Sequence, residues 1–100
     1  MKLYIVTGDM QKDCMIYNQI FYTYANNAKE ACQLARDTWA AKNWSHLFHI
    51  HANKSTKQDI GTCTVRNWKN ETIAGKALIG KFICTDFHAW RVNGRNLYGV

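Results

Sequence analysis

The stretch "NNAKEACQLARDTWAAKN", residues 26–43, decides the predicted fold because it carries the full pattern of one amphipathic helix. Asn27 stands at an N-cap position and Glu30 follows three residues later, which is the capping-box arrangement. Small and apolar side chains then recur at the three- and four-residue spacing of one helical face: Ala28, Ala31, Cys32, Ala35 and Trp39. Lys42 falls in the last turn, where positive charge suits the helix dipole. We therefore expect one helix over residues 28–42, with its alanine side close against a sheet.

Two segments before this helix predict a β-hairpin. "KLYIVT", residues 2–7, alternates with period two, and Gly8-Asp9 is expected to end it, so that "GDMQKDC" forms a polar turn. "MIYNQIFYTY", residues 15–24, alternates again. Because neither face of this second segment is polar throughout, it is predicted to be a central strand.

The segments after the helix predict further strands. "HLFHIHAN" (46–53) and "IGTCTVRNW" (60–68) are expected to pair across the polar turn "KSTKQD". "ETIAGKALIGKFICTDF" (71–87) indicates one strand or two, kinked at Gly75 or Gly80. "AWRVNGRNLY" (89–98) carries Asn93-Gly94, a strong hairpin-turn signal. We expect an α+β fold: a small antiparallel sheet of about five strands, in β-β-α-β-β-β order, with one helix on one face.

Length and composition indicate one folded domain over residues 1–100. Apolar residues make up 47% of the chain and charged residues 20%, which excludes a disordered protein. No apolar run is long enough for a membrane span, and the N-terminus does not match a signal peptide, so a cytoplasmic location is expected. The four cysteines form no CxxC motif, which argues against a zinc ribbon or a thioredoxin site. They are expected to be reduced, and two disulfides would form only in a secreted protein.

The positive charge is concentrated in the second half of the chain. The formal net charge is +6, and residues 54–100 contribute +5 of it. A basic surface attracts nucleic acid or an acidic protein through its long-range field. The alternative interpretation is that this charge serves solubility alone.

Three histidines in "SHLFHIHANKS", residues 45–55, raise the question of chemistry. Period two places His49 and His51 on one strand face, and puts Phe48, Ile50 and Ala52 on the other, under the helix. The favoured interpretation is a half-exposed strand face that performs no chemistry.

Two chemical interpretations of the histidines remain open. His49, His51 and Cys63 would form a zinc site if a fourth ligand joined them. Alternatively, His49 or His51 would act as a general base while Lys81 or Arg66 stabilised a phosphate, as in a small ribonuclease. We expect neither a metal nor another cofactor, and no Gly-rich phosphate loop or paired carboxylates are present in the sequence.

The face opposite the helix is the expected binding surface. The helix is predicted to cover Phe48, Ile50, Cys63, Val65 and Phe82. The other face would then present His49, His51, Thr62, Thr64, Arg66, Trp68 and Lys81. Interleaved basic and aromatic groups suit base stacking with phosphate contact, and they also suit a protein interface. The predicted binding residues are Arg66, Trp68, Lys81, Trp90, Arg91 and Arg95.

The opening "KLYIVTGD", the strand "IFYTYA" and the helix start "NNAKEACQLA" resemble the ββα beginnings of short phage and mobile-element proteins, some of which are anti-CRISPR inhibitors. The resemblance implies a single small domain that docks on a host nucleoprotein complex and blocks it without catalysis. The positive charge differs from that of inhibitors that mimic DNA, so contact with acidic protein or with guide and target strands is expected instead.

The function expected from the sequence is therefore non-catalytic binding to a protein or nucleoprotein complex in the host cytoplasm, with no membrane partner. The alternative is a nucleic-acid-binding protein, followed by a small basic ribonuclease or toxin.

Overall fold

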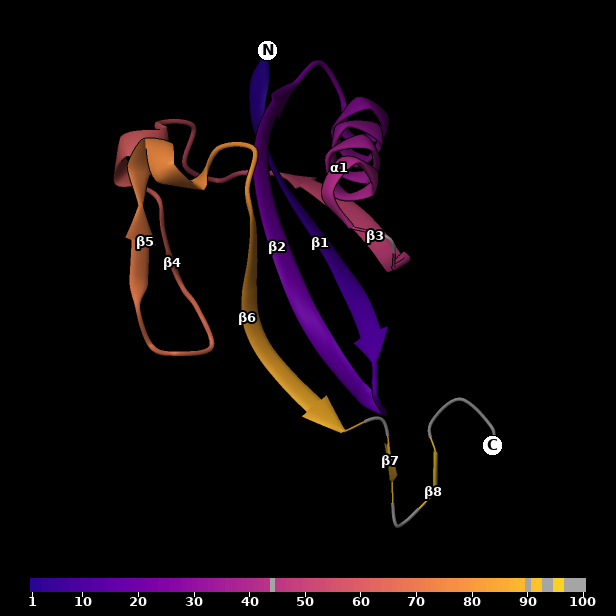
Figure 1. Ribbon diagram of the computed structural model, residues 1–100. Coiled ribbons are helices and arrows are strands. Elements are labelled where there is room, and N and C mark those ends of the chain that lie inside the picture. The colour runs from indigo at the N-terminus through magenta and orange to yellow at the C-terminus, as the bar shows by residue number, and fades with distance from the viewer. Residues whose placement is uncertain (44, 90, 93–94, 97–100) are drawn as a thin grey trace.

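The computed structural model describes the backbone except at residues 44, 90, 93–94 and 97–100, and the side chains of residues 1–43 and 45–89. Its main body is a four-stranded antiparallel sheet in the order β3-β1-β2-β6, with one helix, α1, against one face (Figure 1). The bounds are β1 Lys2–Lys12, β2 Met15–Ala25, α1 Ala28–Lys42, β3 Leu47–Lys54 and β6 Phe82–Ala89. The α+β class and the single covering helix are confirmed.

Short elements between β3 and β6 form a second, smaller unit. A two-stranded sheet is flanked by two turns of 3₁₀ helix, and it lies beyond β6 on the side away from α1 (Figure 1). Their bounds are η1 Ile60–Thr62, β4 Thr64–Arg66, β5 Thr72–Ala74 and η2 Gly75–Leu78. A last two-stranded pair consists of β7 Arg91–Val92 and β8 Arg95–Asn96. The predicted Asn93-Gly94 turn lies outside the described residues.

The first hairpin is longer than predicted. β1 and β2 pair without a break from Lys2 opposite Ala25 to Lys12 opposite Met15, so the expected end of the first strand at Gly8-Asp9 is wrong. Only Asp13 and Cys14 form the turn, both with positive φ, at 53° and 62°. A two-residue turn of this kind matches the twist of its strands, and the backbone ladder continues through polar residues up to it. The predicted central position of β2 is confirmed.

The helix begins and ends where the sequence predicts. The Asn27 side chain accepts a hydrogen bond from the Glu30 backbone N–H at 2.8 Å, and the Glu30 carboxylate accepts one from the Asn26 side chain at 3.1 Å. Ala31 and Ala35 are fully buried. They pack with residues of the sheet in one cluster, whose other buried members are Val6, Phe21, Ala25 and Ala52.

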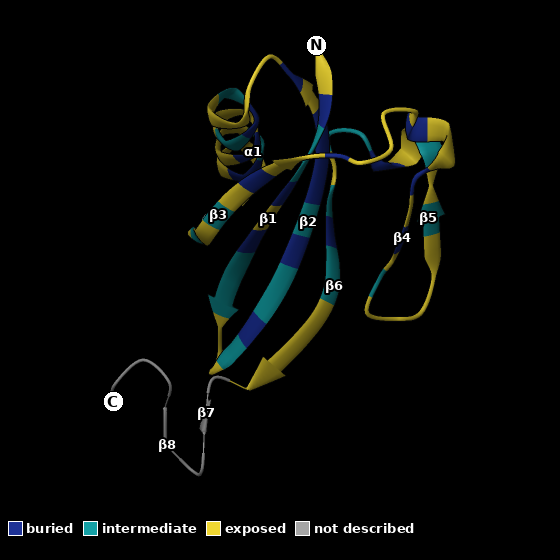
Figure 2. Cartoon of the chain, turned by 180° about the vertical axis from the view of Figure 1, so that it is seen from behind, coloured by how far each residue is buried: buried dark blue, intermediate teal, exposed yellow. Residues whose placement is uncertain are grey.

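The opposite face of the sheet is covered as well, which corrects the prediction of an open face. Leu3, Tyr22 and Ile83 from the sheet form a second buried cluster with residues from the small unit: Ile60, Cys63, Val65 and Leu78. Cys63 and Val65 therefore pack on this face, so the prediction that they lie under the helix is wrong. Figure 2 shows the result, with buried segments along β1 and β2 and an exposed far end of β6.

The third strand differs most from its prediction. β3 pairs with β1, and not with residues 60–68, of which only Thr64–Arg66 form a strand. His49 has a φ of 53°. Here two residues of β3, His49 and Ile50, lie opposite the single residue Gly8 of β1, which is a β-bulge. Beyond the bulge, Ile50 and Ala52 lie under the helix as predicted. Phe48 does not, because the bulge breaks the period-two alternation and leaves this side chain 43% exposed.

The segment predicted as one kinked strand or two contains two, β5 and β6, separated by η2. Gly75 and Gly80 both adopt positive φ, at 64° and 69°, at the two chain bends that the sequence marked. β6 carries a second bulge, since its register against β2 shifts between Asn18 and Gln19. The large sheet thus has four strands where the prediction had about five in one sheet.

Candidate functional site

Two exposed aromatic side chains meet beside the far end of β6. Trp68, 51% exposed, contacts Phe87, 45% exposed, edge to face, with ring centroids 5.5 Å apart and an interplanar angle of 75°. Tyr17 extends the row, with its ring centroid 5.7 Å from that of Phe87. The Lys69 ammonium lies 5.2 Å from the Trp68 ring centroid, within the range of a cation–π contact. Large apolar rings left in solvent next to cations are typical of a binding surface.

A tight turn holds Trp68 in place. The Asn67 side-chain oxygen accepts the backbone N–H groups of Lys69 at 3.0 Å and Glu71 at 2.9 Å. The Trp68 backbone N–H donates to the Cys84 carbonyl of β6 at 2.9 Å. The loop between β4 and β5 is therefore ordered before any partner arrives, which lowers the entropic cost of binding.

These residues border a groove of about 320 Å³, which we call the aromatic groove. It is lined by Arg66, Asn67, Trp68, Asn70, Thr85, Asp86 and Phe87. The Asp86 carboxylate accepts a hydrogen bond from the Asn18 side chain, so one of its oxygens is already engaged. The groove thus combines stacking surface, a guanidinium and amide groups, which can hold a planar or apolar group together with a polar one.

The structure brings together two of the six predicted binding residues. Arg66 and Trp68 both line the aromatic groove. Lys81 is exposed but lines a different pocket, between α1 and β6. Arg91 and Arg95 belong to β7 and β8, and their side chains, like the whole of Trp90, lie outside the described residues.

Phe87, Tyr17 and Asn67 are not among the residues predicted from the sequence. Phe87 reads only as part of a strand, and nothing in a single sequence shows that a loop from residues 67–71 reaches it. The sequence does contain a signal for the turn, because Asn67 and Asn70 stand on either side of Trp68. Asparagine favours turns in which its side chain bonds the backbone, and it tolerates positive φ. Asn70 has a φ of 64°.

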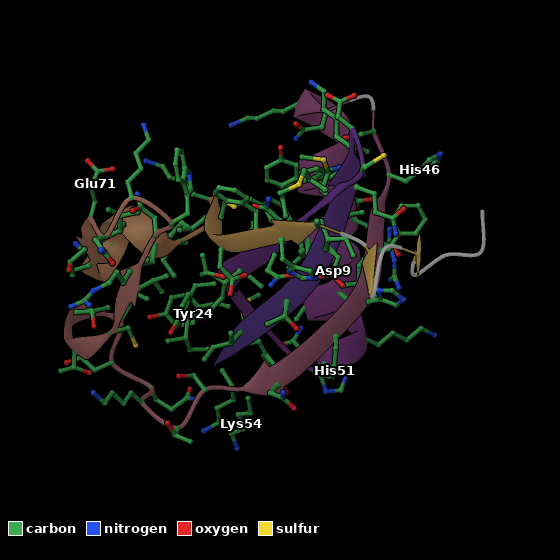
Figure 3. The ribbon with its side chains drawn as sticks, turned by 90° about the horizontal axis from the view of Figure 1, so that it is seen from below. Asp9, Tyr24, His46, His51, Lys54 and Glu71 are labelled. Atoms are coloured by element: carbon green, nitrogen blue, oxygen red, sulfur yellow. The ribbon has the colours of Figure 1, made fainter. Side chains whose placement is uncertain are left out.

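The two alternative chemical arrangements of the histidines are not assembled among the described residues. His49 is exposed and pairs through Nδ1 with the Asp9 carboxylate at 3.0 Å. Cys63 is buried in the cluster under the small unit, and in the part of the chain that the structure describes no three metal-ligating side chains converge. Figure 3 shows His46 and His51 at separate places along the β3 side, with Glu71 at the opposite end of the molecule.

The sheet topology separates the histidines from the two cations that would stabilise a phosphate. His49 and His51 lie on β3, whereas Lys81 directly precedes β6, and these strands are opposite edges of the sheet. Arg66 lies in the small unit beyond β6. The structure therefore contradicts the pairing of these histidines with either cation.

Two acidic groups have raised pKa values. Burial, and to a lesser extent the nearby Asp86 carboxylate, raises the pKa of the Cys84 thiol, although a hydrogen bond to the Asp86 backbone lowers it in part. Burial, followed by the proximity of Cys63, raises the pKa of the Tyr22 hydroxyl. Both groups therefore carry their protons near neutral pH. All four cysteines are free thiols.

The helices in the described part of the chain are all too short or too polar to cross a membrane. Comparison of the chain with protein-family models, with curated proteins and with solved structures found no match.

Proposed function

We propose that this protein acts by binding and not by catalysis, and that it docks on a nucleoprotein defence complex of the host through the aromatic groove, as a phage-encoded inhibitor. The observation that carries the proposal is the exposed Trp68–Phe87 pair on a preorganised loop, beside Arg66. Tryptophan and arginine contribute disproportionately to binding energy at protein interfaces. The proposal places the protein in the host cytoplasm.

The resemblance of the first forty residues to short phage proteins supports the choice of partner, and the net charge of +6 supports an acidic or nucleoprotein surface. The groove also contains no nucleophile paired with a general base among its described residues. Docking without chemistry is the role that these features suit best.

The test is a plaque assay in bacterial strains that each carry one CRISPR system directed against an infecting phage. Expression of the chain is expected to restore plaquing in at least one strain. Trp68→Ala is expected to abolish the effect, because loss of a central aromatic anchor typically costs 2 kcal/mol or more, about a 30-fold loss of affinity. Binding of the purified variant to the purified effector complex should weaken to a similar extent.

Phe48→Ala is the matched control. Phe48 is also an exposed aromatic, but it lies on β3, at the other edge of the sheet. This variant should protect the phage as well as the wild type does. Protection in none of the strains would refute the inhibitory function, and full protection by Trp68→Ala would refute the groove as the docking surface.

A second candidate function is direct binding of single-stranded nucleic acid. The position of Lys69 over the Trp68 ring favours it, because stacked bases and neutralised phosphates need rings and cations side by side. Fluorescence anisotropy with labelled oligo-dT should then show binding that weakens steeply with salt and is lost in Trp68→Ala. Absence of binding at low salt would exclude this candidate and leave the protein-docking proposal standing.

A further inference from the structure

A second pocket lies on the helix side of the sheet, where α1 leaves part of the surface uncovered. The helix packs over β3, β1 and β2, and it leaves β6 at the edge of that face (Figure 1). The gap between the C-terminal end of α1 and the start of β6 is a pocket of about 490 Å³. It is lined by Gln19, Thr38, Trp39, Lys42, Asn43, Gly80, Lys81, Phe82 and Cys84.

The charge of this pocket is positive. Lys42 and Lys81 line it from opposite sides, one from the last turn of α1 and one from the residue before β6, and no carboxylate is among the lining residues. Neither lysine pairs with an acidic side chain within the described residues. The Cys84 thiol, whose pKa is raised by burial, adds no negative charge near neutral pH.

The pocket also contains the buried side-chain amide of Gln19. The residue is only 8% exposed, it lines the pocket, and its side chain has no hydrogen-bond partner among the described residues. Of the other neutral polar side chains of the pocket, the Thr38 hydroxyl donates to the Leu34 carbonyl at 2.7 Å, and one of the two Asn43 amide N–H groups donates to the Trp39 carbonyl at 3.2 Å. A buried polar group without a partner costs free energy, so a ligand acceptor at this amide would relieve that cost.

The remaining wall of the pocket is aromatic. Trp39 meets Phe82 edge to face, with centroids 5.0 Å apart, and Phe82 stacks on Phe21 at 4.6 Å. This packing fixes the orientation of both rings that line the pocket. The pocket therefore offers two ammonium groups and an amide donor beside a rigid apolar surface.

We propose that this pocket binds an oxyanion, a carboxylate or a phosphate ester, carried on an aromatic or other apolar body. Lys42 and Lys81 neutralise the anion, the Gln19 amide donates a hydrogen bond to it, and the apolar body lies against Trp39 and Phe82. This site is separate from the aromatic groove and does not depend on the function proposed for it.

The experiment titrates the full chain with phenyl phosphate, benzoate and inorganic phosphate, and follows ¹⁵N–¹H spectra. The Gln19 side-chain amide and the Gly80 backbone amide are expected to shift with phenyl phosphate or benzoate. Phenyl phosphate should bind at least tenfold more tightly than inorganic phosphate, because only the former contacts the aromatic wall. If phenyl phosphate binds more tightly than benzoate, the natural ligand carries a phosphate ester; if benzoate binds more tightly, it carries a carboxylate.

Two double variants with the same charge change separate the pocket from general basicity. Lys42→Gln with Lys81→Gln should weaken binding at least tenfold, whereas Lys54→Gln with Lys57→Gln should change it less than twofold. Trp68→Ala should leave the affinity unchanged. Equal weakening in both double variants, or no shift of the Gln19 amide with any probe, would overturn the proposal.

Gln19→Leu gives a readout that a purely structural glutamine would not give. Removing an unpartnered buried amide should raise the melting temperature of the free protein while it lowers the affinity for phenyl phosphate. A lower melting temperature would show that the amide serves the fold, and would remove it from the proposed site.

Discussion

At the scale of single residues, positive φ angles mark where the backbone departs from its ordinary conformations. The described non-glycine residues with positive φ are Asp13, Cys14, His49 and Asn70. Aspartate and asparagine tolerate this region because their side chains can bond locally, and His49 is held there by a bulge. Cys14 has no such compensation, which makes it a point of conformational strain in the β1–β2 turn.

We expect Cys14→Gly to stabilise the protein by about 1 kcal/mol, since glycine adopts positive φ without a Cβ clash and Asp-Gly is a favoured two-residue turn. Urea unfolding, followed by circular dichroism, measures the change. Cys14→Ala is the control, because it removes the thiol but keeps the Cβ. Stabilisation of equal size by alanine would show that the thiol, and not the backbone angle, is responsible.

At the scale of elements, the Asn27 N-cap marks the start of α1. Asn27→Ala should destabilise the protein by about 1 kcal/mol, because the N–H of Glu30 loses its acceptor. The exposed Asn26 donates to the Glu30 carboxylate from its side chain at 3.1 Å and from its backbone N–H at 3.4 Å. Asn26→Ala removes only the first of these bonds, so it should cost less than half as much. Thermal unfolding of the two variants gives the comparison. Equal losses would mean that the cap at Asn27 is not the main stabilising contact.

The sequence predicted the elements whose signals are local and missed those set by distant contacts. The helix over residues 28–42 needed only spacing and a cap, and both were readable. The pairing of β3 with β1 contains a one-residue bulge at His49. Period two cannot reveal this bulge, so the predicted face of Phe48 is wrong. In the candidate site, Arg66 and Trp68 were identified from their composition, but Phe87 joins them only through the tertiary fold.

At the scale of the whole molecule, β1 and β2 lie between the two hydrophobic clusters and contribute side chains to both. Leu78 is fully buried in the cluster under the small unit, whereas Leu34 on α1 is 37% exposed. Leu78→Ala should therefore lower the free energy of unfolding by about 2–5 kcal/mol, and Leu34→Ala should lower it much less.

Leu3 and Val6 lie on the same strand but pack in opposite hydrophobic clusters. Because one strand joins the two clusters, unfolding in urea should stay a single transition. Separate transitions for the tryptophan fluorescence and circular dichroism signals would contradict this.

The two bulges have a consequence for behaviour at high concentration. An edge strand with a regular row of free amides and carbonyls is a template on which another molecule can add its own strand, the first step toward fibrils. Here both outer strands of the large sheet are irregular, β3 at His49 and β6 beside Asn18 and Gln19. Each irregularity twists the edge and breaks its repeat, and on β6 the Cys84 carbonyl is already taken by the Trp68 N–H. The edge strands therefore carry their own protection against edge-to-edge polymerisation.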